Sequence, residues 1–136
     1  DIRKFEEIGT HPAANKLAIG EAILFHNGIG AARKEARLRY LARYWMNQLK
    51  DVPRIRFNTS FDPAQSCAIA NVAVEGIEPV AIGGYLMATH KIFTTPIVHD
   101  EFRGLRITPN VYTTLKELDR FSDVLATIAR KGLPAA

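Results

Sequence analysis

The chain has 136 residues, 47% of them hydrophobic and 24% charged. These values fit a globular chain with one sizeable core and exclude disordered, collagen-like and low-complexity chains. The single cysteine, Cys67, excludes an intramolecular disulfide and a cysteine-cluster zinc site. The longest apolar stretch, around residues 80–88, is far shorter than the ~20 residues of a membrane span. No signal peptide opens the chain and residue 1 is Asp, so we expect a cytoplasmic fragment or processed product.

Positive charge gathers between residues 33 and 56, although the whole chain carries only +4. Eight basic residues face only Glu35 and Asp51 there, so this segment carries +6 and the remainder −2. The pattern indicates a local basic helix and does not imply general nucleic-acid affinity. Aromatic residues interleaved with the cations can stack on bases, but at helical spacing they more often belong to a core.

Two helices are expected in the first part of the chain. Residues 10–12, Thr-His-Pro, are typical of a helix start, because proline is tolerated in the first turn. The first helix would end at the Asn-Gly pair 27–28, where both residues tolerate a left-handed conformation. The second would run over 31–49 and bury one stripe at spacings of three and four. That stripe consists of Leu38, Leu41, Trp45 and Leu49.

Four strands, a third helix and a closing helix are expected after that. Period-two alternation predicts a strand over 54–58, and a small apolar run predicts a buried strand over 66–74. A helix would open at Glu78-Pro79 and continue to about His90. Two short strands would follow over 92–95 and 104–108, and Thr114 with Glu117 fits the capping box of the last helix. This order predicts an α+β fold with a mainly antiparallel sheet and helices packed on it.

The residues alone form no self-contained catalytic constellation. Cys67 is expected mid-strand, as a buried structural thiol. The four histidines lack metal-ligand spacing, and we expect surface or capping roles for His26 and His90. Gly28-Ile29-Gly30 lacks the third glycine of a phosphate loop and follows a helix instead of a strand. Lys91 is expected to be solvated, because nothing nearby in the sequence would lower its pKa.

Arg106 is the strongest candidate for a binding residue. It lies on a predicted strand that ends beside a loop and is backed by the capped helix, so its planar guanidinium would be held in place. An arginine so held meets a carboxylate with two parallel hydrogen bonds. An exposed ion pair explains an arginine at this position equally well. For Arg103 we expect a pair with Asp100 or Glu101.

Two segments carry a resemblance to a known family. Residues 106–114 read RITPNVYTT, close to a family ending of Arg, then Ile, Val or Ala, then Ser or Thr, three variable residues and Tyr-Asn-Thr. Residues 5–14 read FEEIGTHPAA and look like an FE-x-GT-P element that leads into the last helix of a large domain. The chain therefore resembles class V pyridoxal-phosphate aminotransferases of fold type I over nearly its whole length. Within them it is most similar to the isopenicillin N epimerase-like branch.

The resemblance implies a role for each matching residue. Arg106 would bind the α-carboxylate of an amino-acid substrate, with His99 as an active-site neighbour. Thr10 would bind the phosphate of the cofactor in the partner subunit of a homodimer. Residues 1–30 would end the large domain and 31–136 would form the small domain. The Schiff-base lysine would belong to that large domain, upstream of this chain. Pyridoxal 5'-phosphate would thus serve the full-length enzyme, and this chain alone would bind none and be inactive.

Two further expectations concern the reaction and the partner. Cysteine desulfurases of this family carry a nucleophilic cysteine in the loop before the substrate arginine, whereas residues 95–103 contain none. This predicts transamination, epimerisation or elimination and excludes desulfuration. The alternative function is a free-standing α+β binding or regulatory domain whose basic helix docks an acidic partner. Neither nucleic acid nor a membrane is expected as a partner.

Overall fold

The structure is a computed structural model, and it describes residues 1–5, 9 and 13–134. The chain divides into two compact units, Asp1–Lys34 and Glu35–Ala136. Among the described residues, no helix is both long enough and apolar enough to cross a membrane.

The first unit is helical. A 3-10 helix, Ile2–Phe5, precedes α1, Ala13–Ile29. Gly30 follows with a φ of +85°, a left-handed conformation that glycine adopts without steric cost, so α1 ends here and α2 begins at the next residue. This confirms the expected first helix, while its expected start at residues 10–12 lies outside the described residues. No residue of α1 is buried within this chain.

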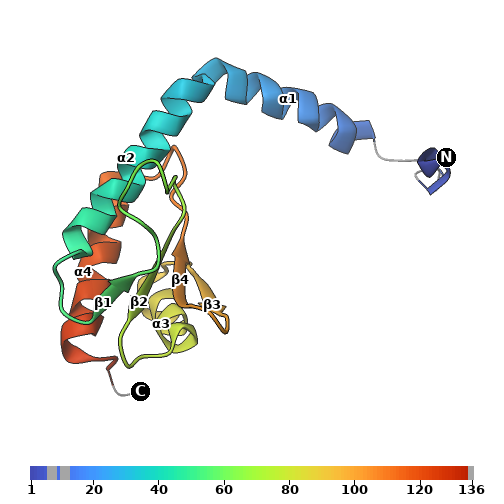
Figure 1. Cartoon of the computed structure of the whole chain (residues 1–136). Coiled ribbons are helices and arrows are strands. Elements are labelled where there is room, and N and C mark those ends of the chain that lie inside the picture. Colours follow the sequence, from blue (N-terminus) through green and yellow to red (C-terminus); the bar gives the residue numbers. More distant parts are fainter. Residues whose placement is uncertain (6–8, 10–12, 135–136) are drawn as a thin grey trace. The chain divides into compact units, whose positions relative to one another are not determined.

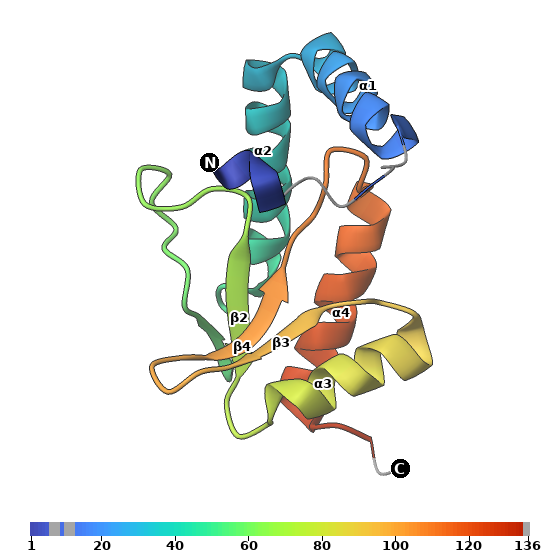
Figure 2. The same cartoon turned by 90° about the vertical axis from the view of Figure 1, so that its right-hand side faces the viewer.

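The second unit is a four-stranded antiparallel sheet with helices packed on it, which confirms the expected α+β fold. The strands follow the order β1-β2-β4-β3. Helices α2 and α4 lie over one face of the sheet (Figure 1 and Figure 2). The bounds in chain order are α2 Ala31–Leu49, β1 Ile55–Phe57, β2 Ala70–Val74, α3 Pro79–Tyr85, a π-helical turn Leu86–His90, β3 Thr95–Val98, β4 Arg103–Ile107 and α4 Leu115–Lys131.

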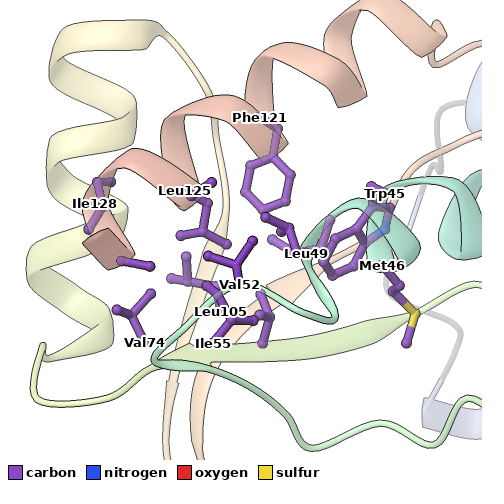
Figure 3. Close-up of a cluster of buried hydrophobic side chains, with 14 of the residues drawn as sticks. Trp45, Met46, Leu49, Val52, Ile55, Val74, Leu105, Phe121, Leu125 and Ile128 are labelled. Carbon is purple, nitrogen blue, oxygen red and sulfur yellow. The ribbon is translucent and has the colours of Figure 1, made fainter. Parts of the chain in front are cut away.

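The core of this unit forms around Trp45 of α2. Its ring centroid lies 5.6 Å from that of Phe57 and 5.5 Å from that of Phe121. Figure 3 shows side chains of α2, α4 and the strands meeting in this cluster. Three members of the expected stripe on α2 are at most 1% exposed, and the fourth, Leu38, is half-buried. Burying a large apolar side chain stabilises the fold by about 1.5–3 kcal/mol, so this contact holds α2 on the sheet.

The second strand begins later than expected. β2 starts at Ala70, whereas the small apolar run predicts residue 66. The residues before it form a loop, because Arg39 of α2 donates hydrogen bonds to the carbonyl oxygens of Pro63 and Ser66. Cys67 lies in this loop and is exposed, with Sγ 3.7 Å from Nη2 of Arg39. The prediction of a buried thiol in mid-strand is therefore wrong.

The third strand is also displaced along the chain. β3 occupies residues 95–98, whereas the sequence pattern predicts 92–95. The helical stretch ends at His90, as expected, but Lys91 caps the π-helical turn with a φ of +58°, and the N–H of Ile92 donates to the carbonyl oxygen of Leu86, so these two residues close the turn and do not begin a strand. The strand therefore begins only at Thr95, where it pairs with Arg106 of β4. Pro96 is tolerated in β3 because this is an edge strand, with one side free of ladder hydrogen bonds.

The capping box of α4 is confirmed. The Thr114 hydroxyl accepts a hydrogen bond from the N–H of Glu117, and Oε2 of Glu117 accepts from the N–H of Thr114 at 2.8 Å. The backbone N–H and then the hydroxyl of Thr114, both donating to this carboxylate, hold the pKa of Glu117 below its ordinary value of 4.5.

We expect Thr114→Ala to lower the free energy of unfolding by about 1 kcal/mol, because α4 loses its N-cap. Since the folded-state pKa of Glu117 is lowered, the carboxylate contributes stability above pH 4.5, and this is lost as the pH falls through the lowered value. The difference from wild type should therefore shrink in acid. Urea denaturation at several pH values measures it. Thr127→Ala, which removes an exposed hydroxyl within the same helix, serves as the control.

Gly104 allows β4 to approach the amides of its neighbours. A Cβ at this position would collide with Oδ1 of Asn71 and lie 2.7 Å from the carbonyl oxygen of Val72. That Oδ1 accepts a hydrogen bond from Nδ2 of Asn58 at 2.7 Å, and the same Nδ2 donates to the carbonyl oxygen of Arg103 at 2.9 Å. The missing side chain therefore makes room for an amide network that joins three segments of the sheet.

Replacing Gly104 by Ala should destabilise the chain by about 1–3 kcal/mol, because a methyl group is forced into a packed site. Gly84→Ala is the matched control: no atom lies within 4 Å of the added Cβ, and α3 gains helix propensity there. Thermal or chemical denaturation compares the two variants. Equal stabilities for both would contradict the close approach described here.

Candidate functional site

A cavity of about 380 Å³ opens where β4 ends and β3 begins. Its walls are the segment 90–95, the end of β4 with residues 106–109, and the first turns of α4. All three belong to the second unit. The cavity brings together segments that the sequence analysis treats separately.

Arg106 lines this cavity from β4. Leu105 and Ile107 are buried, and because side chains alternate along a strand, Arg106 emerges on the opposite face and is exposed. Its Nη2 donates to Oγ1 of Thr95, its cross-strand partner, at 3.5 Å. Within the described residues, no carboxylate forms an ion pair with Arg106. The guanidinium is thus held on a paired strand and remains available to an anion.

Two more cations line the same cavity. Lys91 lies at the left-handed end of the π-helical turn, and its Nζ donates to the carbonyl oxygen of Ala88 at 3.0 Å. Arg120 of α4 is exposed. Sequence reasoning missed Arg120. Its position in the sequence could have indicated it: Arg120 follows Glu117 by three residues on the capped helix, so the two side chains lie on the same side of α4.

Thr94 is a buried polar residue in the wall of the cavity. It is 9% exposed, and its hydroxyl has no hydrogen-bond partner among the described residues. Buried hydroxyls usually form a hydrogen bond, so the Thr94 hydroxyl still has an unused donor and acceptor. The cavity wall therefore holds cations and an unpartnered hydroxyl.

His99 lies in the turn between β3 and β4. Its Nδ1 accepts a hydrogen bond from the N–H of Glu101, and its ring lies 5.6 Å from that of Phe102. It follows Thr95, the cross-strand neighbour of Arg106, by four residue steps, which is about 13 Å of extended backbone. The structure therefore does not bring His99 and Arg106 together. Thr10, the expected cofactor-binding residue, lies outside the described residues.

Arg103 has a different partner from the one expected. Its Nη1 lies 3.3 Å from Oε1 of Glu78, the N-cap residue of α3, and not beside Asp100 or Glu101. The prediction is wrong because Arg103 already belongs to β4, opposite Val98, and so has left the loop. More than half of each side chain in the pair is exposed, so screening keeps its contribution small.

His26 and His90 have local partners. Nδ1 of His26 lies 3.2 Å from Nζ of Lys34, at the surface of the first unit. His90 ends the π-helical turn, half-buried, and its Nε2 lies 3.4 Å from the Tyr85 hydroxyl with the two rings edge to face. No group of three or more His, Cys, Asp and Glu side chains in the described residues is arranged to hold a metal ion.

The basic segment binds the chain's own backbone. Nη2 of Arg37 donates to the carbonyl oxygen of Thr113, and Arg54 donates to those of Glu75 and Ala129. Arg39 binds Glu35 and the loop before β2, and Arg56 pairs with the carboxylate of Glu75 at 2.7 Å. Arg37 and Arg39 thus tie two loops to α2, and Arg54 ties the end of α4 to the segment before β1. This use of the cations weakens the case for a basic docking helix.

The fold is similar to that of a known enzyme. The apo structure of a cysteine desulfurase from Thermococcus onnurineus NA1 matches with a TM-score of 0.80 and 19% sequence identity. The match covers 93% of this chain and 33% of that one, so this chain spans about a third of the desulfurase. A likeness at this identity shows the shared α+β fold.

The prediction that excludes cysteine desulfuration is wrong. A protein with this fold is a cysteine desulfurase, so the fold accommodates that reaction. The exclusion assumed that a nucleophile must come from residues 95–103 and that Cys67 lies on the wrong element to replace it, whereas Cys67 lies in a loop and is exposed. Reaction type depends on groups brought together from several segments, and one loop without a cysteine does not decide it.

A comparison with family models identifies the relatives of this chain. The model described as "Aminotransferase class-V" matches residues 2–96, which is more than half of the chain. No curated protein matches the sequence. The matched residues include both helices before the sheet, the first two strands and α3. The chain belongs to the class V aminotransferase family.

Proposed function

We propose that this chain provides the site for the substrate's α-carboxylate in a pyridoxal-phosphate-dependent class V enzyme that acts on an amino acid. The observation that carries this proposal is Arg106, which lines a cavity and forms no ion pair with any described carboxylate. A carboxylate is the partner that matches its planar, permanently charged fork.

The support around Arg106 suits a positioning role. β4 pairs with β2 on one side and β3 on the other, so the backbone that carries Arg106 is restrained on both sides. Two parallel hydrogen bonds from a restrained guanidinium fix both the place and the orientation of a bound carboxylate. This orients the rest of the amino acid, because the α-carbon is bonded directly to that carboxylate.

Pyridoxal phosphate, when bound, supplies the electron sink for breaking a bond at the α-carbon. The described cavity fits the substrate's carboxylate better than it fits this cofactor. Its lysine, Lys91, donates to a backbone carbonyl and is exposed, whereas a Schiff-base lysine is held in a desolvated pocket. We therefore propose that the isolated chain is inactive and that the remaining cofactor contacts come from a large domain.

The quaternary and domain proposals rest on sequence resemblance. We propose a homodimeric full-length enzyme in which Thr10 binds the cofactor phosphate of the partner subunit. Residues 1–30 would complete the large domain and residues 31–136 would form the small one. His99 would act from a conformation or partner contact outside this cavity.

Within the family, we propose the isopenicillin N epimerase-like branch, on the resemblance of the segment around Arg106. Assignment to this branch is a statement about sequence similarity and does not specify the reaction. Desulfuration of cysteine therefore belongs among the reactions to be assayed, beside transamination, epimerisation and elimination.

In the full-length enzyme, Arg106→Lys should lower kcat/KM, because lysine cannot form the two-pronged contact. The loss should correspond to about 2 kcal/mol or more of transition-state stabilisation. Arg103→Lys is the matched control, since Arg103 lies on the same strand and pairs with Glu78 at the surface. Steady-state kinetics with the best amino-acid substrate compares them. If Arg103→Lys is equally or more harmful, Arg106 does not bind the carboxylate.

Incubation of the isolated chain with pyridoxal phosphate, followed by borohydride reduction, should give no stoichiometric adduct at Lys91. The reason is that Lys91 is exposed and its Nζ donates to the carbonyl oxygen of Ala88, so it does not lie in a desolvated pocket. Peptide mass analysis locates any modified lysine. A complete adduct at Lys91 would show that this chain forms a cofactor site of its own.

A further inference from the structure

We infer that the substrate carries a second anionic group at the end of its side chain, and that Arg120 binds it. This inference rests on the proposed function, because it takes Arg106 as the site for the α-carboxylate. It assigns a substrate class: amino acids with a carboxylate, phosphate or similar oxyanion beyond the α-carbon.

The charges that line the cavity do not cancel. Among its described lining residues, Lys91, Arg106 and Arg120 are cationic and Glu117 is the carboxylate, which leaves +2 with neutral histidine. An amino acid with an aliphatic side chain is a zwitterion without net charge, so it leaves this excess unchanged. A second anion makes the substrate net negative and so reduces the excess.

The nearby carboxylates of α4 do not neutralise Arg120. Glu117 accepts two hydrogen bonds from Thr114, and Asp119 accepts one from the Tyr44 hydroxyl at 2.7 Å. Asp123 lines a different cavity. No ion pair joins any described acidic residue to Arg120. Lys116, one turn before it, adds a like charge and so increases the local positive potential.

The lining side chains come from separate elements of the fold. Arg106 projects from β4 and Arg120 from α4, so the two cations come from different walls. Apolar Ile107 and Leu118, from the same two elements, also line the cavity. Two cations and apolar side chains in one cavity complement two anions joined by methylene groups.

Titration of the 136-residue chain with small probes, followed by NMR, tests this inference. L-Glutamate and O-phospho-L-serine carry the second anion, L-norvaline lacks it, and inorganic phosphate is the free-anion probe. We expect the two dianionic amino acids to bind about ten-fold or more tightly than L-norvaline, as for one additional charge-assisted contact.

The variants are Arg120→Gln, Arg106→Gln and, as a control on the same helix but outside the cavity, Arg130→Gln. Arg120→Gln should reduce binding of the dianionic probe to the level of L-norvaline and leave L-norvaline unchanged. Arg106→Gln should weaken all three amino acids, and Arg130→Gln none. The dispersion of the amide spectra shows in each case that the variant is folded.

The outcomes separate this inference from the proposed function. If wild type does not prefer the dianionic probes, or Arg120→Gln keeps the preference, the second-anion site is wrong. If Arg106→Gln leaves every amino acid unaffected, the carboxylate site itself fails. If inorganic phosphate binds through Arg120 as tightly as O-phospho-L-serine, the cavity is a free-phosphate site, which also overturns the inference.

Discussion

The register of β4 between β2 and β3 is the constraint on which the site depends. Leu105 and Ile107 are buried on the helix-covered face, so period-two alternation sends Arg106 to the other face. A slip of one residue would exchange these faces and bury the guanidinium. Gly104 secures the register, because only a residue without a side chain leaves room for the amide of Asn71. The same strand register therefore sets both the packing of the core and the position of the guanidinium.

Contacts between α2 and α4 set the position of the cavity wall that α4 forms. Trp45 packs against Phe121, and at the surface the Tyr44 hydroxyl donates to Asp119, whose carboxylate raises the pKa of that tyrosine. Gln48 donates to the same carboxylate at 2.8 Å. Because α4 is fixed by these contacts and by its capping box, the turn that carries Arg120 begins at a defined place. A helix that reads as a basic surface element thus serves mainly to hold the fold together.

The family of this chain and the reaction it takes part in depend on different features. The class V family model and the likeness to a desulfurase concern the fold and ancestry of a chain that spans about a third of that enzyme. The described cavity is lined by three cations, and its lysine is exposed, so the cavity by itself does not decide a reaction. In the function proposed above, the same cavity would suit several reactions at an amino acid's α-carbon, because each of them needs the carboxylate held still. For this reason one loop without a cysteine was a poor guide to the reaction.

The sequence by itself determined the elements whose signals are local: α2 with its apolar stripe, β1, β4, and the capping box of Thr114 and Glu117. Each depends on the spacing of a few neighbouring residues. The tertiary structure decided the start of β3, the exposure of Cys67 and the partner of Arg103, because each is set by contact with a segment far away in the sequence. Arg106 was recognisable from its motif, but Arg120 was not. Arg120 reaches the same cavity only because α4 packs beside the end of β4, and no local sequence pattern predicts this packing.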